Sequence, residues 1–371
     1  MLSQPAGPRR VLMTLDAMGG VWRYALDLAA AWREMGIETA LAGFGPRPDA
    51  ARRAEAEAVA ELVWTDEPLD WMVEHPRDLV GVPRTLLRLA DEVGAEAIQL
   101  NSLSQAAGLE AAVPVLAVAH SCVPTWFRAV RGLPPEGAWA WHAALNADAL
   151  ARADRVVAPS RAHADALQAA YPGAPPAAVI PNAVSLDAIP QAAATGAVAF
   201  AAGRWWDEGK GAAILDAAAA RTETPLLAAG PLARDGDGRR GGPQHRFRHA
   251  CALGPQSHAE CLRLAARAGI FVSPSIYEPF GLAALEAAAA GAGLVLSDIP
   301  VYRELWDGAA LFAPPRDPAA FAAAVDRLAE DPRRRADLGA RARARAVELT
   351  PRRQALALRR ILADIQHREP C

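Results

Sequence analysis

The chain has 371 residues, of which 52% are hydrophobic and 22% are charged, a composition typical of a folded globular protein and not of a disordered one. Two domains are expected, because single hydrophobic cores rarely grow beyond about 250–300 residues. The 39 basic and 42 acidic residues give a formal net charge of −3, which argues against a nucleic-acid-binding protein. No apolar run approaches the length of about 18 residues that a transmembrane helix needs.

The N-terminal stretch and the cysteines bear on the location of the protein. The apolar run after Arg9 and Arg10 is short and lacks a small-residue cleavage site, so it predicts a first strand and not a signal peptide. The four cysteines form no C-x-x-C pair, which favours a reduced protein without structural zinc or disulfides. We therefore expect a cytoplasmic protein. A weak peripheral contact with the inner face of a membrane, through Arg9, Arg10, Arg52 and Arg53, stays open.

Short apolar runs alternate with amphipathic stretches in the first half of the chain, as in α/β proteins with mostly parallel sheets. The first predicted strand, residues 11–15, leads into a helix that starts near Gly20 and stops at Gly36. The further predicted strands are residues 38–43, 97–100, 113–119, 155–158 and 177–180. The further predicted helices are residues 49–62, 136–152 and 161–170, the last of them capped by Ser160.

The same alternation resumes after residues 183–196, which we interpret as a linker. The predicted strands are residues 197–202, 225–229, 270–274, 293–297 and 309–312. The predicted helices are residues 211–220, 258–268, 282–290, 318–329 and 351–367. A Gly-, Asp- and Arg-rich loop covers residues 231–248, and Ser257 and Glu260 form a capping box for the helix that follows.

This pattern predicts an α/β protein with two Rossmann-like, doubly wound domains that face each other across a cleft. The first domain spans residues 1–182 and the second spans residues 197–349. Residues 350–371 are predicted to form a C-terminal helical segment. Crossing back to the first domain is one of the arrangements open to this segment.

The loop at the start of the second domain carries the first candidate site. Its sequence, GRWWDEGKG over residues 203–211, combines flexible backbone with two cations, Arg204 and Lys210. Arginine offers a planar fork to phosphate oxygens and lysine a compact point charge, so the pair suits a diphosphate. Lys210 is also the only lysine in the chain. The alternative is a solvated loop whose cations pair with Asp207 and Glu208.

A second candidate site is the stretch SIYEPFGLAALE over residues 275–286. It follows a predicted strand and leads into a helix near Leu282, whose first amides point toward anything bound at the end of that strand. Glu278 lies in the turn and Glu286 in the second turn of the helix, so they can accept hydrogen bonds from different hydroxyls of one ligand. In the alternative interpretation Glu278 caps the helix and Glu286 is exposed.

Two weaker candidates lie in the first domain. Gly19 and Gly20 fill the first strand–helix turn, where a glycine pair permits close approach of a ligand, but they lack the G-x-G-x-x-G spacing of a dinucleotide-binding fold. His120 ends a predicted strand, where an imidazole can donate or accept a hydrogen bond. A lone histidine is, however, more often structural.

Together these segments resemble the retaining glycosyltransferases of family four, which have the GT-B fold. The similar segments are MGGVWRYALDLA (18–29), ADRVVAPSRAHADAL (153–167), VIPNAVSL (179–186), AGRWWDEGKG (202–211) and the stretch 253–300. The similarity spans nearly the whole chain, and the block from Glu278 to Glu286 is a specific signature.

The resemblance implies that the protein is a hexosyltransferase that uses a nucleotide-sugar donor. Arg204 and Lys210 look like the basic pair that holds the donor diphosphate. Glu278 looks like the residue that contacts the hydroxyls of the transferred sugar. The backbone amides that would assist it belong to Phe280, Gly281 and Leu282.

The remaining roles also come from the resemblance. Glu286 looks like the acceptor of hydrogen bonds from the nucleotide ribose, and His120 like the first-domain residue beside the transferred sugar. Gly19 and Gly20 resemble the loop that lets donor and acceptor approach. The implied partners are a nucleotide sugar and a saccharide or lipid-linked acceptor. Enzymes of this kind need no cofactor and generally no metal ion.

No metal site is predicted. Asp235 and Asp237 match a D-x-D spacing that metal-dependent transferases of another fold use, but they lie in a loop rich in glycine and arginine. His245, His249 and His258 do not have the spacing of a metal site.

Some features depart from the family or leave alternatives open. Arg204 and Lys210 are one residue further apart than in the commonest form of the motif. The helix sequence AALEAAAAG lacks the usual methionine and cysteine. A nucleotide-sugar epimerase on the same fold and a non-catalytic nucleotide-sugar-binding subunit stay as alternatives.

Overall fold

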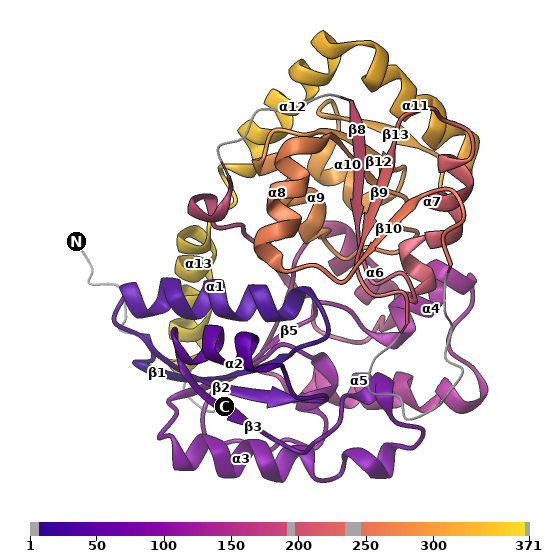
Figure 1. The fold of residues 1–371 in the computed structure, drawn as a ribbon. Coiled ribbons are helices and arrows are strands. Elements are labelled where there is room, and N and C mark those ends of the chain that lie inside the picture. The colour runs from indigo at the N-terminus through magenta and orange to yellow at the C-terminus, as the bar shows by residue number, and fades with distance from the viewer. Residues whose placement is uncertain (1–6, 191–196, 234–245, 368–371) are drawn as a thin grey trace. The chain divides into compact units, whose positions relative to one another are not determined.

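The computed structural model describes residues 7–190, 197–233 and 246–367. It divides into two compact units (Figure 1). Unit 1 comprises Met1–Asn182 together with Pro351–Cys371, and unit 2 comprises Ala183–Thr350. Each unit has its own sheet, and the strands of both sheets pair in parallel. The prediction of two Rossmann-like domains is confirmed.

Unit 1 is built on a seven-stranded sheet. Its strands are β1 (Arg10–Asp16), β2 (Glu38–Phe44), β3 (Glu61–Trp64), β4 (Ala97–Leu100), β5 (Val115–Val118), β6 (Arg155–Ala158) and β7 (Ala178–Val179). They are arranged in the order β3-β2-β1-β4-β5-β6-β7. The α-helices of this unit are α1 (Gly20–Glu34), α2 (Ala50–Glu57), α3 (Val82–Glu92), α4 (Val123–Arg131), α5 (Trp141–Arg152), α6 (Arg161–Ala170) and α13 (Pro351–Gln366).

Strand β1 shows that this sheet is covered on both faces. Leu12 belongs to one core cluster, which includes buried residues of α3, α5 and α6. Its neighbours Val11 and Met13 belong to another, which includes buried residues of α1 and α13. Successive side chains of a strand point to opposite faces, so helices must cover both. This is the doubly wound arrangement.

Helix α13 packs against α1 although the two lie at opposite ends of the chain (Figure 1). The indole Nε1 of Trp32 donates a hydrogen bond of 3.3 Å to the carbonyl oxygen of Ala355. Leu358 and Leu362 are fully buried in the same cluster as Trp32. The last helix therefore completes the core of the first unit.

Unit 2 is built on a six-stranded sheet. Its strands are β8 (Val198–Ala202), β9 (Leu226–Ala229), β10 (Cys251–Gly254), β11 (Gly269–Ser273), β12 (Gly293–Ser297) and β13 (Ala310–Ala313). They are arranged in the order β10-β9-β8-β11-β12-β13. The α-helices of this unit are α7 (Ala212–Ala219), α8 (His258–Ala268), α9 (Leu282–Ala289), α10 (Pro300–Trp306), α11 (Pro318–Glu330) and α12 (Pro332–Ala346).

The local predictions failed at two of the edge strands and at several helices. The predicted helix 49–62 was wrong beyond Glu57, because residues 61–64 form the edge strand β3. Another edge strand, β10, was not predicted, whereas the edge strands β7 and β13 were. Both β3 and β10 are only partly buried and therefore show little hydrophobic periodicity. Helices α3, α4, α10 and α12 were also not predicted, and the predicted helix 136–152 begins as a 3₁₀ turn before α5.

The capping predictions were correct in part. Ser160 caps α6 by accepting the N–H of His163 at 3.0 Å. Ser257 caps α8 by accepting the N–H of Glu260 at 3.2 Å. The carboxylate of Glu260, however, forms an ion pair with Arg263. The described residues therefore show only one half of the predicted capping box.

Asp216, in the middle of α7, fixes the chain segment that enters β10. Its Oδ1 accepts the backbone N–H groups of Arg248, His249 and Ala250 at 2.9, 2.8 and 3.0 Å. Burial raises the pKa of this carboxyl, but the three backbone donors outweigh burial, and the net pKa lies below its usual value. The folded state therefore stabilises the charged form of Asp216 relative to the unfolded state.

We expect Asp216→Asn to lower the free energy of unfolding by about 1–3 kcal/mol at pH 7, since hydrogen bonds to a charged group are lost. A depressed folded-state pKa stabilises the fold above the unfolded pKa of about 3.9, and this contribution disappears as the pH falls through the folded value. The gap between wild type and variant should thus shrink below about pH 4 in urea unfolding curves. Asp337→Asn, at an exposed position on α12, is the control. An equal gap at pH 7 and pH 3 would contradict this account.

Candidate active site

The order of the strands locates the candidate site in unit 2. From β8 the chain runs outward through β9 and β10, and β11 then returns to the other side of β8. Open parallel sheets bind ligands outside the carboxyl ends of their strands, at the point where the strand order reverses. The loops after β8 and β11 flank this point. These are the two loops that the sequence analysis selected in this half of the chain.

Backbone contacts join the two loops. The carbonyl oxygen of Gly209 accepts the N–H groups of Ile276 and Tyr277 at 2.8 and 3.3 Å. Gly211 has a φ of +71°, and a Cβ atom there would lie 2.3 Å from the carbonyl oxygen of Pro274. Only glycine fits such a position, so the close approach of the loops depends on this residue.

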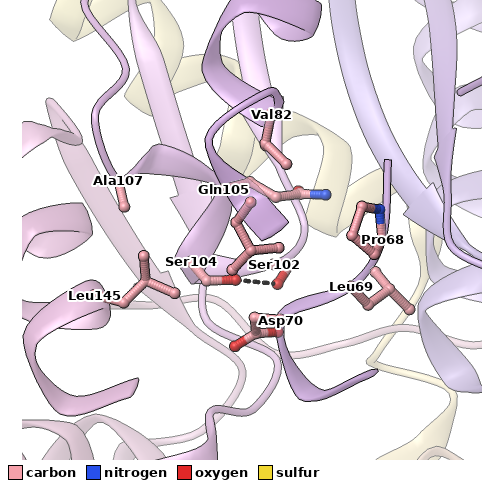
Figure 2. A pocket seen from close by; sticks show the side chains of 10 residues that line it. Pro68, Leu69, Asp70, Val82, Ser102, Ser104, Gln105, Ala107 and Leu145 are labelled. Atoms are coloured by element: carbon pink, nitrogen blue, oxygen red, sulfur yellow. Dashed lines mark hydrogen bonds between the residues drawn. The ribbon is translucent and has the colours of Figure 1, made fainter. Parts of the chain in front are cut away.

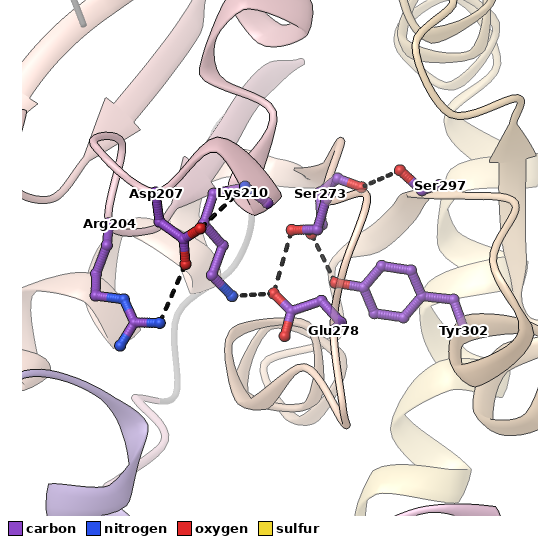
Figure 3. A network of polar contacts seen from close by, with 9 residues as sticks. Arg204, Asp207, Lys210, Ser273, Glu278, Ser297 and Tyr302 are labelled. Carbon is purple, nitrogen blue, oxygen red and sulfur yellow. Dashed lines mark hydrogen bonds and ion pairs between the residues drawn. The ribbon is translucent and has the colours of Figure 1, made fainter. Parts of the chain in front are cut away.

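Lys210 and Glu278 meet across the two loops (Figure 3). The Nζ of Lys210 forms an ion pair with Oε1 of Glu278, and their side chains are only 19% and 11% exposed. Ser275 donates a hydrogen bond of 3.1 Å to the same oxygen. The structure thus brings together a cation and a carboxylate that lie 68 positions apart in the sequence. The alternative in which Glu278 caps α9 is wrong, because the N-cap is Gly281 and no side chain caps the helix.

Arg204 lies in the same loop and is held by Asp207 (Figure 3). Its Nη2 donates to Oδ2 of Asp207 at 3.2 Å, and its guanidinium lies 5.5 Å from the ring centre of Trp206. Oδ1 of Asp207 accepts the N–H of Gly209 at 2.9 Å, which ties Arg204 to the turn that carries Lys210. The Nε of Arg204 is buried and has no hydrogen-bond partner in the described part of the chain. Such a group is uncommon in a folded protein and marks a place where a ligand can supply the partner.

A row of hydrogen-bonded hydroxyl groups leads away from Glu278 (Figure 3). Ser275 lies 3.2 Å from the hydroxyl of Ser273, which in turn lies 2.6 Å from the hydroxyl of Tyr302. Burial, and then the charge of Glu278, raises the pKa of Tyr302 well above its usual value, so the phenol stays protonated. Sequence reasoning missed Tyr302 because it belongs to α10, a helix that was not predicted. Its neighbours Ser273 and Ser275 lie at the end of β11. This position is the one feature of the sequence that could have indicated a role for them in the site.

The amino end of α9 adds positive potential. Gly281 has a φ of +91°, and a Cβ atom there would lie 2.7 Å from Cε1 of Tyr302. The carbonyl oxygen of Gly281 accepts hydrogen bonds from the N–H groups of Ala284 and Leu285, the first such bonds of the helix. The amides of the first turn therefore have no side-chain cap, and the helix dipole concentrates partial positive charge there. The predicted amides of Phe280, Gly281 and Leu282 belong to this turn.

Glu286 lies apart from the network of Lys210 and pairs with His258. Oε1 of Glu286 lies 2.9 Å from Nε2 of His258, the first residue of α8. The side chain of Glu286 is 16% exposed, so the alternative of a fully exposed carboxylate is wrong. Sequence reasoning considered His258 only as a metal ligand and missed this contact.

The predicted residues of unit 1 lie at the carboxyl ends of its central strands. Gly19 and Gly20 connect β1 to α1, and His120 follows β5. Strands β1 and β5 flank β4 in the sheet, and the strand order reverses between β1 and β4. These loops therefore occupy the corresponding switch point of the first unit.

His120 is a neutral imidazole. Its ring packs edge-on against Tyr24, with 4.3 Å between ring centres. Burial, and then the neighbouring His163, lowers the pKa of His120 to about 3. Its Nε2 is buried and makes no hydrogen bond within the described residues. The structural interpretation, a lone histidine with satisfied hydrogen bonds, does not fit this orphaned nitrogen.

A separate small cavity in unit 1 is lined by polar groups from the loops after β3 and β4 (Figure 2). Asp70, Ser102, Ser104 and Gln105 contribute to its wall. Its interior volume is about 20 Å³, which is room for about one water molecule and not for a sugar. Burial raises the pKa of Asp70, although the neighbouring His142 lowers it. This cavity is therefore not a substrate site.

Two findings concern metals and membranes. In residues 7–190, 197–233 and 246–367, no group of three or more His, Cys, Asp or Glu side chains is arranged to hold a metal ion. Asp235, Asp237 and His245, which the sequence did not favour as metal ligands, lie outside those residues. None of the helices within the same ranges combines the length and the apolar character needed to cross a bilayer.

Comparison with known proteins connects this geometry to a family. Residues 18–188 match the family model "Glycosyltransferase Family 4", and residues 248–345 match "Glycosyl transferases group 1". A stretch of 92 residues is 46% identical to a glycogen synthase of Mycobacterium tuberculosis. That stretch covers 24% of this chain and 22% of the relative, so the match spans about a fifth of the curated relative's length.

Solved structures share the whole fold at low sequence identity. The sucrose-phosphate synthase of Thermosynechococcus elongatus superposes with a TM-score of 0.78 at 18% identity, over 96% of this chain and 99% of that chain. HepE of Anabaena, in complex with UDP and glucose, gives 0.77 at 18% identity, over 96% and 100%. WaaG, a glycosyltransferase involved in lipopolysaccharide biosynthesis, gives 0.69 at 13% identity, over 97% and 100%. With its two parallel sheets and the two family models that match most of its length, the chain belongs to the family 4 glycosyltransferases of GT-B fold.

Proposed function

We propose that this protein transfers a sugar from a nucleoside-diphosphate donor to a hydroxyl group of a saccharide or lipid-linked acceptor, with retention of the anomeric configuration. The observation that carries the proposal is the contact between Lys210 and Glu278 at the switch point of unit 2. A cation for phosphate and a carboxylate for sugar hydroxyls stand side by side there, as a nucleotide sugar requires.

Arg204 and Lys210 bind the diphosphate in this proposal. An ammonium has three donors, and Glu278 engages one of them, which leaves donors for phosphate oxygens. The guanidinium of Arg204 has five N–H donors, and its contact with Asp207 occupies one nitrogen. The amides at the start of α9 add to the positive potential. These groups stabilise the charge that develops on the leaving diphosphate.

Glu278 binds hydroxyls of the transferred sugar and holds Lys210 in place. The bond between the anomeric carbon and the diphosphate oxygen breaks through an oxocarbenium-like state. The acceptor oxygen then bonds to that carbon from the same face, and the departing phosphate oxygen takes the acceptor's proton. The protein contributes mainly orientation and leaving-group stabilisation.

Unit 1 contributes Gly19, Gly20 and His120 in this proposal. Because His120 is neutral, it acts as a hydrogen-bond partner of the sugar and not as a cation. Its orphaned Nε2 is the atom that would make this contact.

A thermal-shift panel tests the proposal. We expect one nucleoside diphosphate among UDP, ADP, GDP and TDP, and its sugar nucleotide, to raise the melting temperature, because ligands that bind only the folded state stabilise it by RT ln(1 + [L]/Kd). UDP and UDP-glucose are the first choice, since HepE of Anabaena was solved with UDP-glucose. The stabilising sugar nucleotide should then be slowly hydrolysed with retention. The proposal fails if no nucleotide shifts the melting point, and acceptor-free conversion to another sugar nucleotide would indicate an epimerase instead.

A further inference from the structure

The pair formed by His258 and Glu286 joins the first turn of α8 to the second turn of α9. The 2.9 Å contact uses Nε2 of the imidazole and only Oε1 of the carboxylate. The other oxygen, Oε2, can still accept hydrogen bonds from a ligand. The two side chains are 33% and 16% exposed, so the pair lies at the surface of the unit, where a ligand can reach it.

His258 is fixed by its place in the fold. It is the first residue of α8, directly after Ser257, whose hydroxyl caps the helix and whose carbonyl oxygen accepts the N–H of Cys261 at 3.0 Å. Helix α8 packs against α9, so the imidazole reaches Glu286 from a rigid support. The nearby thiol of Cys261 has a pKa raised to about 11 by burial and then by Glu286 and Glu260, so it stays neutral. Among the described residues of α8, His258 makes the hydrogen bond to this carboxylate.

We propose that His258 is a positioning residue that holds Glu286 ready to accept the ribose hydroxyls of the donor nucleotide. This assignment rests on the proposed function, because it takes Glu286 as the ribose-binding group. A glutamate has three rotatable side-chain bonds, and fixing it before the ligand arrives removes part of the entropy cost of binding. His258 therefore strengthens binding specifically through the ribose hydroxyls.

The test compares His258→Ala, which removes the donor, with His258→Gln, whose amide can still donate to the carboxylate. His249→Ala is the matched control, because His249 is an exposed histidine of the same unit. The probes are UDP and 2′,3′-dideoxy-UDP, titrated by calorimetry into each full-length variant. Should the wild type prefer ADP, GDP or TDP, the corresponding pair replaces them.

We expect the wild type to bind UDP about tenfold more tightly than dideoxy-UDP, as for one charge-assisted hydrogen bond. His258→Ala should lose about tenfold in UDP affinity, bind dideoxy-UDP nearly as the wild type does, and so lose its discrimination. His258→Gln should recover most of the UDP affinity. In donor hydrolysis, KM should rise in the alanine variant while kcat stays within about twofold.

Two results would overturn the inference. One is a His258→Ala variant that still prefers UDP over dideoxy-UDP as strongly as the wild type does. The other is an equal loss for both probes that His258→Gln does not restore, which would indicate damage to α8 in general. A wild type that binds none of the four nucleoside diphosphates would instead contradict the proposed function itself.

Discussion

Replacement of Lys210 by alanine should lower the turnover of the sugar nucleotide about hundredfold. Removing one preordered donor to a developing oxyanion costs about 2.7–4 kcal/mol in transition-state stabilisation, and Lys210 is proposed to serve the leaving diphosphate in this way. Its side chain is only 19% exposed and is fixed by Glu278, so water replaces it poorly. Initial rates of donor hydrolysis, and of transfer once an acceptor is known, measure the effect.

Arg204→Ala is the parallel variant and should lose activity to a similar degree. Arg221→Ala serves as the control, because this arginine lies just past the end of α7 and is exposed. Near wild-type turnover in both Lys210→Ala and Arg204→Ala would place the diphosphate elsewhere. Melting curves of all three proteins separate a loss of chemistry from a loss of fold.

Replacement of Glu278 by glutamine should lower kcat at least hundredfold while UDP still binds. The substitution keeps the shape of the side chain but removes the charge that accepts sugar hydroxyls and orients Lys210. The amide oxygen of the glutamine can still accept a hydrogen bond from Lys210, so the diphosphate contacts of Arg204 and Lys210 stay and the Kd for UDP should change less than about fivefold. Calorimetry with UDP and initial-rate kinetics with the sugar nucleotide together give the two values.

Ser275→Ala is a graded control for this prediction. It removes one hydrogen bond to Oε1 of Glu278 and leaves the carboxylate in place, so a loss of about tenfold or less is expected. If Glu278→Gln lost UDP binding and turnover equally, Glu278 would act on the nucleotide and not on the sugar. An unaltered kcat would remove it from the chemistry.

The candidate site shows which functional residues can be identified from the sequence and which cannot. The strand-to-helix loops that carry Arg204, Lys210 and Glu278 could be found because parallel sheets bind ligands at the carboxyl ends of their strands, and cations or acids placed there are visible in a sequence. His258 and Tyr302 could not be assigned in the same way. Each comes from an element whose position relative to α9 depends on how helices pack over the sheet.

The last helix makes the same point for the fold. The sequence predicted a helix from Pro351, with proline in its first turn, but only the packing of Leu358 and Leu362 beside Trp32 shows that it completes the core of unit 1. The sequence of an amphipathic helix shows that one face must pack against an apolar surface, but it does not show which surface that is.

The sequence by itself determined the α/β class, most of the central strands and the residue types at the switch point of unit 2. These follow from local periodicity, capping and the chemistry of single side chains. The tertiary structure alone decided which of these residues are neighbours. The ion pair of Lys210 with Glu278 and the pairing of His258 with Glu286 arise because β8 lies beside β11 and α8 beside α9, and such pairings are set by burial over the whole sheet and not by any local pattern.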